Sequence, residues 1–262
     1  MDDMTNFFHE LGFKKRMRAG ECLYGTFLHE VSSTSIVKIL DASGFDFFVI
    51  DCEHGPFTYE DIATLTAACD YGSMIPVVRI PELKREPFQK VLEAGAGAIM
   101  VPNVKSAAEA KEAVRLSKYR PEGERGFATF YPFSNYSMAH PTEILKKANE
   151  GLSIIIQIET KQAVECIDEI ASVKGIDSLL VGPGDLSLSY DMAGQSTDPF
   201  IVSIIEKVAK AARQNGLAAG MHCYGPEDVA FWKARGMNLM TWSTPTMMIY
   251  TSGKEFLAEV NK

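Results

Sequence analysis

Short apolar runs rich in β-branched residues recur along the chain, separated by segments of helical period. Eight of these runs are predicted strands, at residues 22–28, 46–50, 75–78, 98–101, 154–158, 178–181, 218–221 and 238–242. Most are continuously apolar, which is typical of parallel strands with helices on one side and a packed interior on the other. Strands alternating with helices predict an α/β fold, a (β/α)8 TIM barrel. An open doubly wound sheet is the alternative, but no G-x-G-x-x-G follows the first strand.

The helical segments carry recognisable start and stop signals. Apolar residues recur at three- and four-residue steps in 59–69, 107–116 and 199–212. Ser106 and Asp198 are predicted N-caps of the last two segments. Glycines are expected where helices end, at Gly72, Gly175, Gly216 and Gly236. Because no Pro/Gly/Ser-rich linker divides the chain, we expect residues 1–262 to form a single domain.

The connection over residues 119–140, YRPEGERGFATFYPFSNYSMAH, is too long and too aromatic for a simple turn. Long irregular connections in compact domains are usually lids, binding loops or interface loops. The alternative is a loop that packs on the surface and has no role.

Composition and charge narrow the class of protein. The chain has 262 residues, 46% of them hydrophobic, a formal net charge of −8 and a pI near 5.2. An acidic protein is a poor nucleic-acid partner, and the basic cluster at 14–18 is interpreted as a solvated helix face rather than a nucleic-acid arm. No apolar run approaches the roughly 20 residues that span a bilayer. The N-terminal segment MDDMTNFFHE is acidic where a signal peptide would be basic, so a cytoplasmic protein without membrane contact is expected.

The five cysteines are widely spaced and contain no C-x-x-C. An odd number of scattered cysteines predicts free thiols rather than disulfides or a zinc site.

Polar residues gather where the predicted strands end. The segment FFVIDCEHGP changes directly from an apolar strand to acids and a histidine. Comparable residues follow the other strands, and the set is Asp51, Glu53, His54, Arg79, Asn103, Gln157, Glu159, Gly184, Asp185, His222, Ser243 and Thr244. The carboxyl ends of barrel strands meet at one rim, where the active sites of such barrels lie. We therefore predict a functional site at this rim, the alternative being a structural ring of ion pairs.

The residue types indicate the chemistry of this site. Glu159 and Asp185, on adjacent strands and without a thiolate pair nearby, make a hard oxygen site that suits Mg²⁺ or Mn²⁺ better than zinc. Arg79 can hold a developing oxyanion, and His54 can transfer a proton near neutral pH. Together these groups fit enolate chemistry on a keto acid.

At these residues the chain resembles the HpcH/HpaI aldolase family, the metal-dependent (class II) pyruvate aldolases of the phosphoenolpyruvate/pyruvate barrel superfamily. The resemblance covers nearly the whole chain. It is carried by the order and spacing of six segments: DCEHGP, PVVRIP, LEAGAGAIMVPNV, YRPEGERG, IIQIET and VGPGDLS.

The resemblance implies a role for each residue of the rim. His54 corresponds to the base, acting directly or through a water molecule, and Arg79 to the residue that bridges pyruvate and the reacting carbonyl oxygen. Glu159 and Asp185 correspond to the metal ligands. Gln157 and the backbone around Gly184 and Asp185 correspond to the pyruvate-binding positions.

Two acids are candidates for supporting His54. Glu93, in VLEAGA, stands where the family commonly has an aspartate that supports the histidine, in some cases across a subunit boundary. Asp51 is the second candidate.

The implied reaction is the reversible cleavage of a 4-hydroxy-2-oxo acid to pyruvate and an aldehyde, through a pyruvate enolate stabilised by Mg²⁺ or Mn²⁺, with Co²⁺ as a further option. The implied assembly is a homo-oligomer, a hexamer built as a trimer of dimers that exchange the last barrel helix. The tail TPTMMIYTSGKEFLAEVNK carries apolar residues suited to that exchange. A cap on the chain's own barrel is the alternative.

Some segments depart from the family pattern and leave the aldehyde open. The last strand runs into TWSTP rather than a Gly-x-Asp segment, and FATFYPFSNYSM is unlike the sugar-acid aldolases. His222 and Cys223 are further candidates for substrate contact, unless His222 is simply a hydrogen-bonded rim residue. The rival functions are a citramalyl- or malyl-CoA lyase, for which only Arg120 and Arg125 offer basic groups, and a non-catalytic barrel that binds a keto acid.

Overall fold

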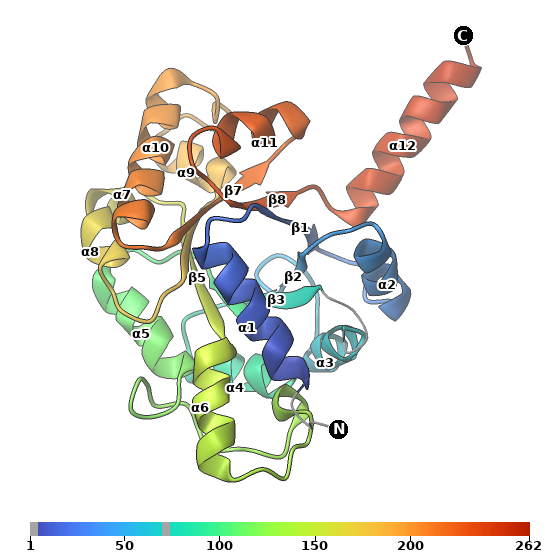
Figure 1. Ribbon diagram of the computed structural model, residues 1–262. Coiled ribbons are helices and arrows are strands. Elements are labelled where there is room, and N and C mark those ends of the chain that lie inside the picture. The colour runs from blue at the N-terminus through green and yellow to red at the C-terminus, as the bar shows by residue number, and fades with distance from the viewer. Residues whose placement is uncertain (1–4, 70–73) are drawn as a thin grey trace.

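The protein is described here by a computed structural model that covers residues 5–69 and 74–262; Gly72, one of the glycines expected to end a helix, lies outside the described residues. Eight parallel strands pair in chain order, and the last pairs with the first, so the sheet closes into a barrel (Figure 1). The strands are β1 (Leu23–Leu28), β2 (Phe47–Asp51), β3 (Ile75–Arg79), β4 (Ala98–Val101), β5 (Ser153–Ile158), β6 (Ser178–Val181), β7 (Ala218–Cys223) and β8 (Leu239–Trp242). The predicted (β/α)8 architecture is confirmed.

Helices connect the strands, and most of them surround the barrel (Figure 1). They are α1 (Thr5–Arg18), α2 (Thr34–Ala42), α3 (Tyr59–Ala67), α4 (Arg85–Glu93), α5 (Ala107–Ser117), α6 (Pro141–Gly151), α7 (Lys161–Glu165), α8 (Ile167–Ala171), α9 (Pro183–Ser189), α10 (Pro199–Gln214), α11 (Pro226–Lys233) and α12 (Pro245–Val260). The predicted caps are confirmed, because the Ser106 side chain accepts a hydrogen bond from the Glu109 nitrogen and Asp198 accepts one from Phe200. Gly216 and Gly236 follow α10 and α11 in the left-handed region, with φ of 68° and 81°.

Alternate residues of each strand face two different cores. On β2, Phe47 and Val49 point into the barrel, whereas Phe48 and Ile50 pack under the surrounding helices. Helix α1 closes the N-terminal end of the barrel, where Phe13 packs edge-on against Phe47 with ring centroids 5.7 Å apart. The barrel is therefore filled at this end, and its open end is the opposite one, where the strands finish.

The basic cluster at 14–18 is tied to the closed end of the barrel. Lys14 and Arg18 lie 3.1 Å and 2.6 Å from the buried Asp177 carboxylate, and Arg16 lies 2.8 Å from Asp46. These ion pairs hold α1 in place. The cluster is thus part of the fold and not a free arm.

The connection at 119–140 lies at this same closed end, because it joins the end of α5 to α6, just before β5 begins. Arg125 is held between the rings of Tyr119 and Phe133, 4.6 Å from each centroid, and Phe133 packs against Ile144. A lid over the chain's own strand ends is therefore excluded. Phe127 and other aromatic residues of the loop remain exposed, which is consistent with the interface alternative.

Helix α12 extends away from the barrel (Figure 1). Its first residue, Pro245, is buried, and beyond it Ile249, Phe256 and Leu257 are between 55% and 70% exposed. The helix does not cap its own barrel, so that alternative is wrong.

Two smaller expectations concern cysteines and the membrane. Each of the five cysteines is a free thiol, as predicted. Among the helices formed by residues 5–69 and 74–262, none combines the length and apolar character needed to cross a bilayer.

Candidate active site

Several of the polar residues predicted at the strand ends line a cavity of about 220 Å³ at the open end of the barrel. Its lining includes His29, His54, Arg79, Gln157, Gly184, Asp185 and His222. Strands β2, β3, β5, β6 and β7 each contribute to this wall, directly or through the loop that follows. Residues far apart in the sequence thus meet at one place.

Arg79 and Asp51 form a buried, two-pronged ion pair beside the cavity. Arg79 Nε and Nη2 donate to Asp51 Oδ1 and Oδ2 over 2.8 Å and 2.7 Å, and Asp51 is fully buried. Burial opposes ionisation of Asp51, but the hydrogen bonds and charge of Arg79 outweigh it and hold the Asp51 pKa below its usual range. Both groups therefore stay charged, and Asp51 fixes the guanidinium plane.

The third guanidinium nitrogen of Arg79, Nη1, faces the side chains of Glu53 and Gln157. Arg79 Nη1 lies 2.9 Å from Glu53 Oε2 and 3.5 Å from Gln157 Oε1. The guanidinium carbon lies 5.1 Å from the centre of the Phe27 ring, which supports it from one side. The arginine is held at several points and presents a fixed positive charge to the cavity.

A tight turn places His54 at the cavity edge. Asp51 Oδ1 accepts hydrogen bonds from the main-chain nitrogens of Glu53 (3.1 Å) and His54 (3.3 Å), and the Gly55 nitrogen donates to the Asp51 carbonyl over 3.0 Å. A Cβ at Gly55 would lie 2.3 Å from that carbonyl oxygen, so the turn requires glycine. The apolar strand β2 thus leads directly into a turn that exposes the His54 ring.

His29 is a site residue that the sequence analysis did not single out. Its Nε2 lies 3.2 Å from Asp51 Oδ2, and burial lowers its pKa. It directly follows β1, as the predicted residues follow the other strands, so the same rule identifies it. Asp51 was a candidate for supporting His54; within the described residues it contacts the His29 ring and the His54 main chain.

Glu159 is a buried carboxylate next to two residues that line the cavity, Gln157 and Gly182. It is 5% exposed, and its Oε1 accepts a hydrogen bond of 2.6 Å from the nitrogen of Asn103. Asn103 has a φ of 55°, which turns this nitrogen toward the carboxylate. The Gln157 amide donates to Oε2. Burial, together with the charges of Glu53 and Asp185, raises the Glu159 pKa to about 7.

Asp185 completes the acidic side of the cavity from the first turn of α9. Gly182, before it, allows close approach, because a Cβ there would lie 2.8 Å from Gln157 Nε2 and 2.9 Å from Glu159 Oε2. The repulsion among Glu53, Glu159 and Asp185 raises the pKa of Glu159 in addition to burial, and a cation among them would relieve it.

This donor set fits a hard divalent cation held by few protein ligands. In residues 5–69 and 74–262, no three His, Cys, Asp or Glu side chains group closely enough to complete a metal site by themselves. Mg²⁺ commonly takes one or two carboxylates and fills its remaining positions with water and substrate oxygens. Glu159 and Asp185 would hold such an ion.

His222 lines the cavity on the side of β7. Its Nδ1 lies 3.0 Å from Thr241 Oγ1, its ring packs edge-on against Phe27, and burial lowers its pKa to about 4. A neutral imidazole here can form hydrogen bonds with a ligand. Cys223, the neighbouring candidate, is fully buried and packs with the outer core instead, so the expectation that it contacts substrate is wrong for this conformation.

Glu93 does not reach this cavity in its own chain. It ends α4, which runs back toward the start of β4 and therefore toward the closed end of the barrel, and its carboxylate accepts from Gln89 over 3.0 Å. Support of His54 by Glu93 could come only from another copy of the chain.

The fold and this rim define a class of protein: a barrel enzyme with an acid pair, an arginine and histidines at the strand ends. Residues 24–246 match the profile of the HpcH/HpaI aldolase/citrate lyase family, and the chain belongs to that family. By reaction class, the protein is a carbon–carbon lyase.

Particular relatives are similar along most of their length. The 2-keto-3-deoxy-L-rhamnonate aldolase of Escherichia coli O17:K52:H18 is 33% identical over 90% of this chain and 88% of its own. Among solved structures, the HpcH/HpaI aldolase from Desulfitobacterium hafniense DCB-2 superposes with a TM-score of 0.91 at 32% identity, covering 95% of this chain and 96% of that one. Citrate synthase SbnG gives a TM-score of 0.86 at 30% identity, covering 96% and 98%.

Proposed function

We propose that the protein is a divalent-metal-dependent aldolase that reversibly cleaves a 4-hydroxy-2-oxo acid to pyruvate and an aldehyde. The observation that carries the proposal is Arg79, fixed by Asp51, lining the same small cavity as Asp185, with the buried Glu159 carboxylate against two other residues of the cavity wall, Gln157 and Gly182. Aldol cleavage of such an acid leaves negative charge on a three-carbon keto acid. A cavity with a fixed guanidinium and a seat for Mg²⁺ or Mn²⁺ is suited to that charge.

Each residue has a distinct task in this proposal. Glu159 and Asp185 would hold the cation, which when bound would supply positive charge beside the keto acid. Gln157 and the backbone at Gly184 orient the keto acid, and Arg79 donates to the oxygen that becomes the aldehyde carbonyl. These groups are preorganised, because Arg79 and Gln157 are already held by neighbouring side chains.

His54 is the proposed base, with His29 as the neighbouring alternative. His54 is exposed at the cavity edge on a turn fixed by Asp51, so it can accept the proton of the 4-hydroxyl group directly or through water. His29 is already paired with Asp51. We therefore assign proton transfer to His54. We assign to His29 the task of positioning the Asp51 carboxylate.

An acyl-CoA lyase is less well supported. Such a substrate needs basic groups for its phosphates, and Arg125 is held between Tyr119 and Phe133 at the closed end of the barrel. The aldolase relatives at about one third identity favour a free hydroxy-keto acid.

We further propose a homo-oligomer in which copies exchange α12, with pairs assembling into a hexamer. The place beside β8 and β1, where a last barrel helix would pack, is an apolar groove of about 260 Å³ lined by Tyr24, Phe45, Val229 and Trp242. The apolar residues of α12 complement that groove. Glu93 and the exposed aromatic loop at 119–140 would then be available to a neighbouring copy.

The reaction itself can be tested by incubating purified protein with a 4-hydroxy-2-oxo acid and measuring pyruvate. Pyruvate should form with Mg²⁺ or Mn²⁺ and stop when a chelator is added. Glu159→Gln should abolish the activity, whereas Glu169→Gln, an exposed glutamate on α8, should not. Metal-independent release of pyruvate by the unmodified protein would contradict the proposal.

A further inference from the structure

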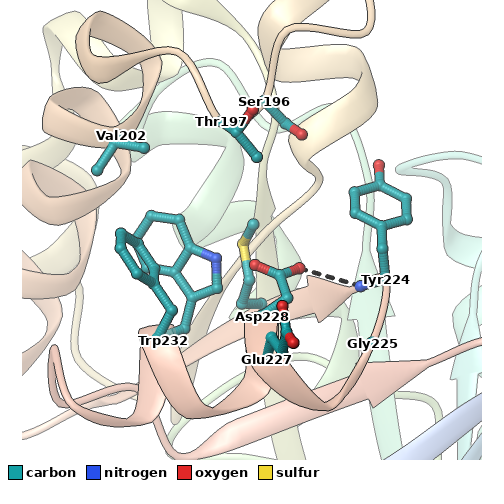
Figure 2. Close-up of a pocket in the computed structure, with 10 residues that line it drawn as sticks. Ser196, Thr197, Val202, Tyr224, Gly225, Glu227, Asp228 and Trp232 are labelled. Atoms are coloured by element: carbon teal, nitrogen blue, oxygen red, sulfur yellow. Dashed lines mark hydrogen bonds between the residues drawn. The ribbon is translucent and has the colours of Figure 1, made fainter.

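The structure has a second cavity, of about 440 Å³ (Figure 2). It lies between the start of α10 and the first turns of α11, and Met221, Phe231 and Trp232 form part of its wall. Tyr224 lines both this cavity and the cavity of the candidate active site, which is the reaction cavity of the proposed aldolase. The two spaces therefore meet at Tyr224.

Tyr224 is held in a defined place at this boundary. Its main-chain nitrogen donates to Asp228 Oδ2 over 3.0 Å, the bond that Figure 2 shows as a dashed line. On the other side its ring packs edge-on against His222, with centroids 5.6 Å apart, and His222 lines the reaction cavity. The residue is 61% exposed, so its ring can turn without leaving a packed core. A chain leaving the reaction cavity past His222 would meet Tyr224 first and the second cavity next.

The chemistry of the second cavity is mostly apolar with a negative edge. Trp232 is 2% exposed and closes one side, and Val202 and Met221 add aliphatic surface. Ser196 and Thr197 bring hydroxyl groups, and Glu227 and Asp228 bring carboxylates. Such a wall favours an uncharged hydrocarbon or aromatic group and repels a carboxylate.

We propose that this cavity binds the side chain of the aldehyde partner, and that the protein therefore prefers aldehydes with an extended, uncharged apolar chain over short or carboxylate-bearing ones. The inference rests on the proposed aldolase function, because it needs the carbonyl end to react beside Arg79. It goes further in naming the class of aldehyde and in assigning Tyr224 as the divider between reaction and binding spaces.

Binding can be measured without any reaction. The chain has two tryptophans, so Trp242→Phe leaves Trp232 as the single reporter in the cavity wall. Titration with 1-hexanol should shift or quench the Trp232 fluorescence in a saturable way, and ethanol at the same concentrations should not. Equal responses to the two alcohols would overturn the proposal.

Kinetics then connect the cavity to turnover. With pyruvate and Mg²⁺, kcat/KM for aldol addition should rise from acetaldehyde through butanal to hexanal by about fourfold for each methylene that is buried. Thr197→Trp, which fills the cavity from an exposed position, should lower kcat/KM for hexanal by at least about tenfold and leave acetaldehyde within about twofold. Thr142→Trp, an exposed threonine on α6, is the matched control and should change neither.

The charge argument has its own variant. Glu227→Lys should raise kcat/KM for the carboxylate-bearing succinic semialdehyde and leave acetaldehyde unchanged. The outcomes separate the two proposals. If pyruvate and acetaldehyde react but chain length and Thr197→Trp have no effect, the second cavity does not bind the aldehyde and the aldolase function stands. If no aldehyde reacts while 1-hexanol still binds at Trp232, the aldolase function fails and the assignment of the cavity to an aldehyde fails with it.

Discussion

Asp51 and Arg79 show how a buried charge pair serves geometry more than stability. A pair of this kind is costly to desolvate, and its removal as a unit is often tolerated. Its position explains its presence, because Asp51 also accepts from the Glu53 and His54 nitrogens and contacts His29. One carboxylate therefore fixes the arginine, the turn that carries His54 and a second imidazole.

Replacing only one partner of this ion pair should destabilise the fold more than replacing both. Arg79→Met leaves the Asp51 charge buried without its partner, and we expect the free energy of unfolding to fall by about 3–5 kcal/mol. Asp51→Asn combined with Arg79→Met should recover a large part of that loss, although activity stays absent. Urea denaturation of the single and double variants measures both values, and a double variant no more stable than Arg79→Met would contradict this account.

Replacing His54 and replacing His29 should have different effects on the reaction. His54→Ala should slow proton transfer by about 10²- to 10⁴-fold, the usual size of acid–base assistance, and leave metal affinity unchanged. His29→Ala should have a smaller effect, because it removes a contact to Asp51 rather than the base. His140→Ala, which alters an exposed N-cap of α6, is the control. Turnover at the normal rate in His54→Ala would remove that residue from the mechanism.

Lys118 links stability to pH at the closed end of the barrel. It is 1% exposed, its ammonium nitrogen donates to the carbonyl oxygens of Asn149 and Leu152, and burial lowers its pKa to about 7. An unfolded chain keeps this lysine protonated up to about pH 10.4, so between these values the unfolded state binds more protons and raising the pH stabilises the fold.

Relative to Lys118→Met, the unmodified protein should therefore become more stable as the pH rises. Its free energy of unfolding should gain about 1.4 kcal/mol on that of the variant for each pH unit between pH 7 and pH 9. Below pH 7 the difference should level off, since both states are then protonated. Chemical denaturation across this range measures it, and a difference that does not vary with pH would show that Lys118 stays charged in the folded protein.

At the scale of elements, the sequence predicted every strand to within two residues of its observed limits, because each is a short apolar run between polar breaks. The position of the candidate site followed from that order alone, since parallel strands end on one side. The loop at 119–140 and Glu93 were harder to interpret, because a pattern of apolar residues does not say whether a neighbouring copy completes a site. The order of elements does show that both lie at the closed end of the barrel.

Helix α12 carries a prediction about assembly. Its exposed apolar residues should be covered by another copy, so Phe256→Glu should weaken association and lower the mass of the protein in sedimentation analysis. Thr251→Glu places the same charge on the same helix at an exposed polar position and should leave the assembly intact. Equal masses for the two variants would argue against exchange of this helix.

At the scale of the whole molecule, the barrel separates stability from chemistry. Its closed end is filled by α1, apolar side chains and the ion pairs of Asp177, whereas its open end collects charges that repel one another. The residue types at the open end could be predicted from the sequence. Contacts such as His29 with Asp51, and the second cavity behind Tyr224, could not, because they depend on side-chain conformations that strand order does not determine.

The central claim is that Glu159 and Asp185 seat a cation that lets this cavity hold a pyruvate carbanion, and isotope exchange tests it without knowledge of the aldehyde. Pyruvate incubated with the protein in deuterated water should gain deuterium at its methyl group when Mg²⁺ or Mn²⁺ is present, as measured by mass spectrometry. The exchange should stop with chelator and in Glu159→Gln. Pyruvate that stays undeuterated beyond the metal-only background, or exchange that persists in Glu159→Gln, would contradict the account.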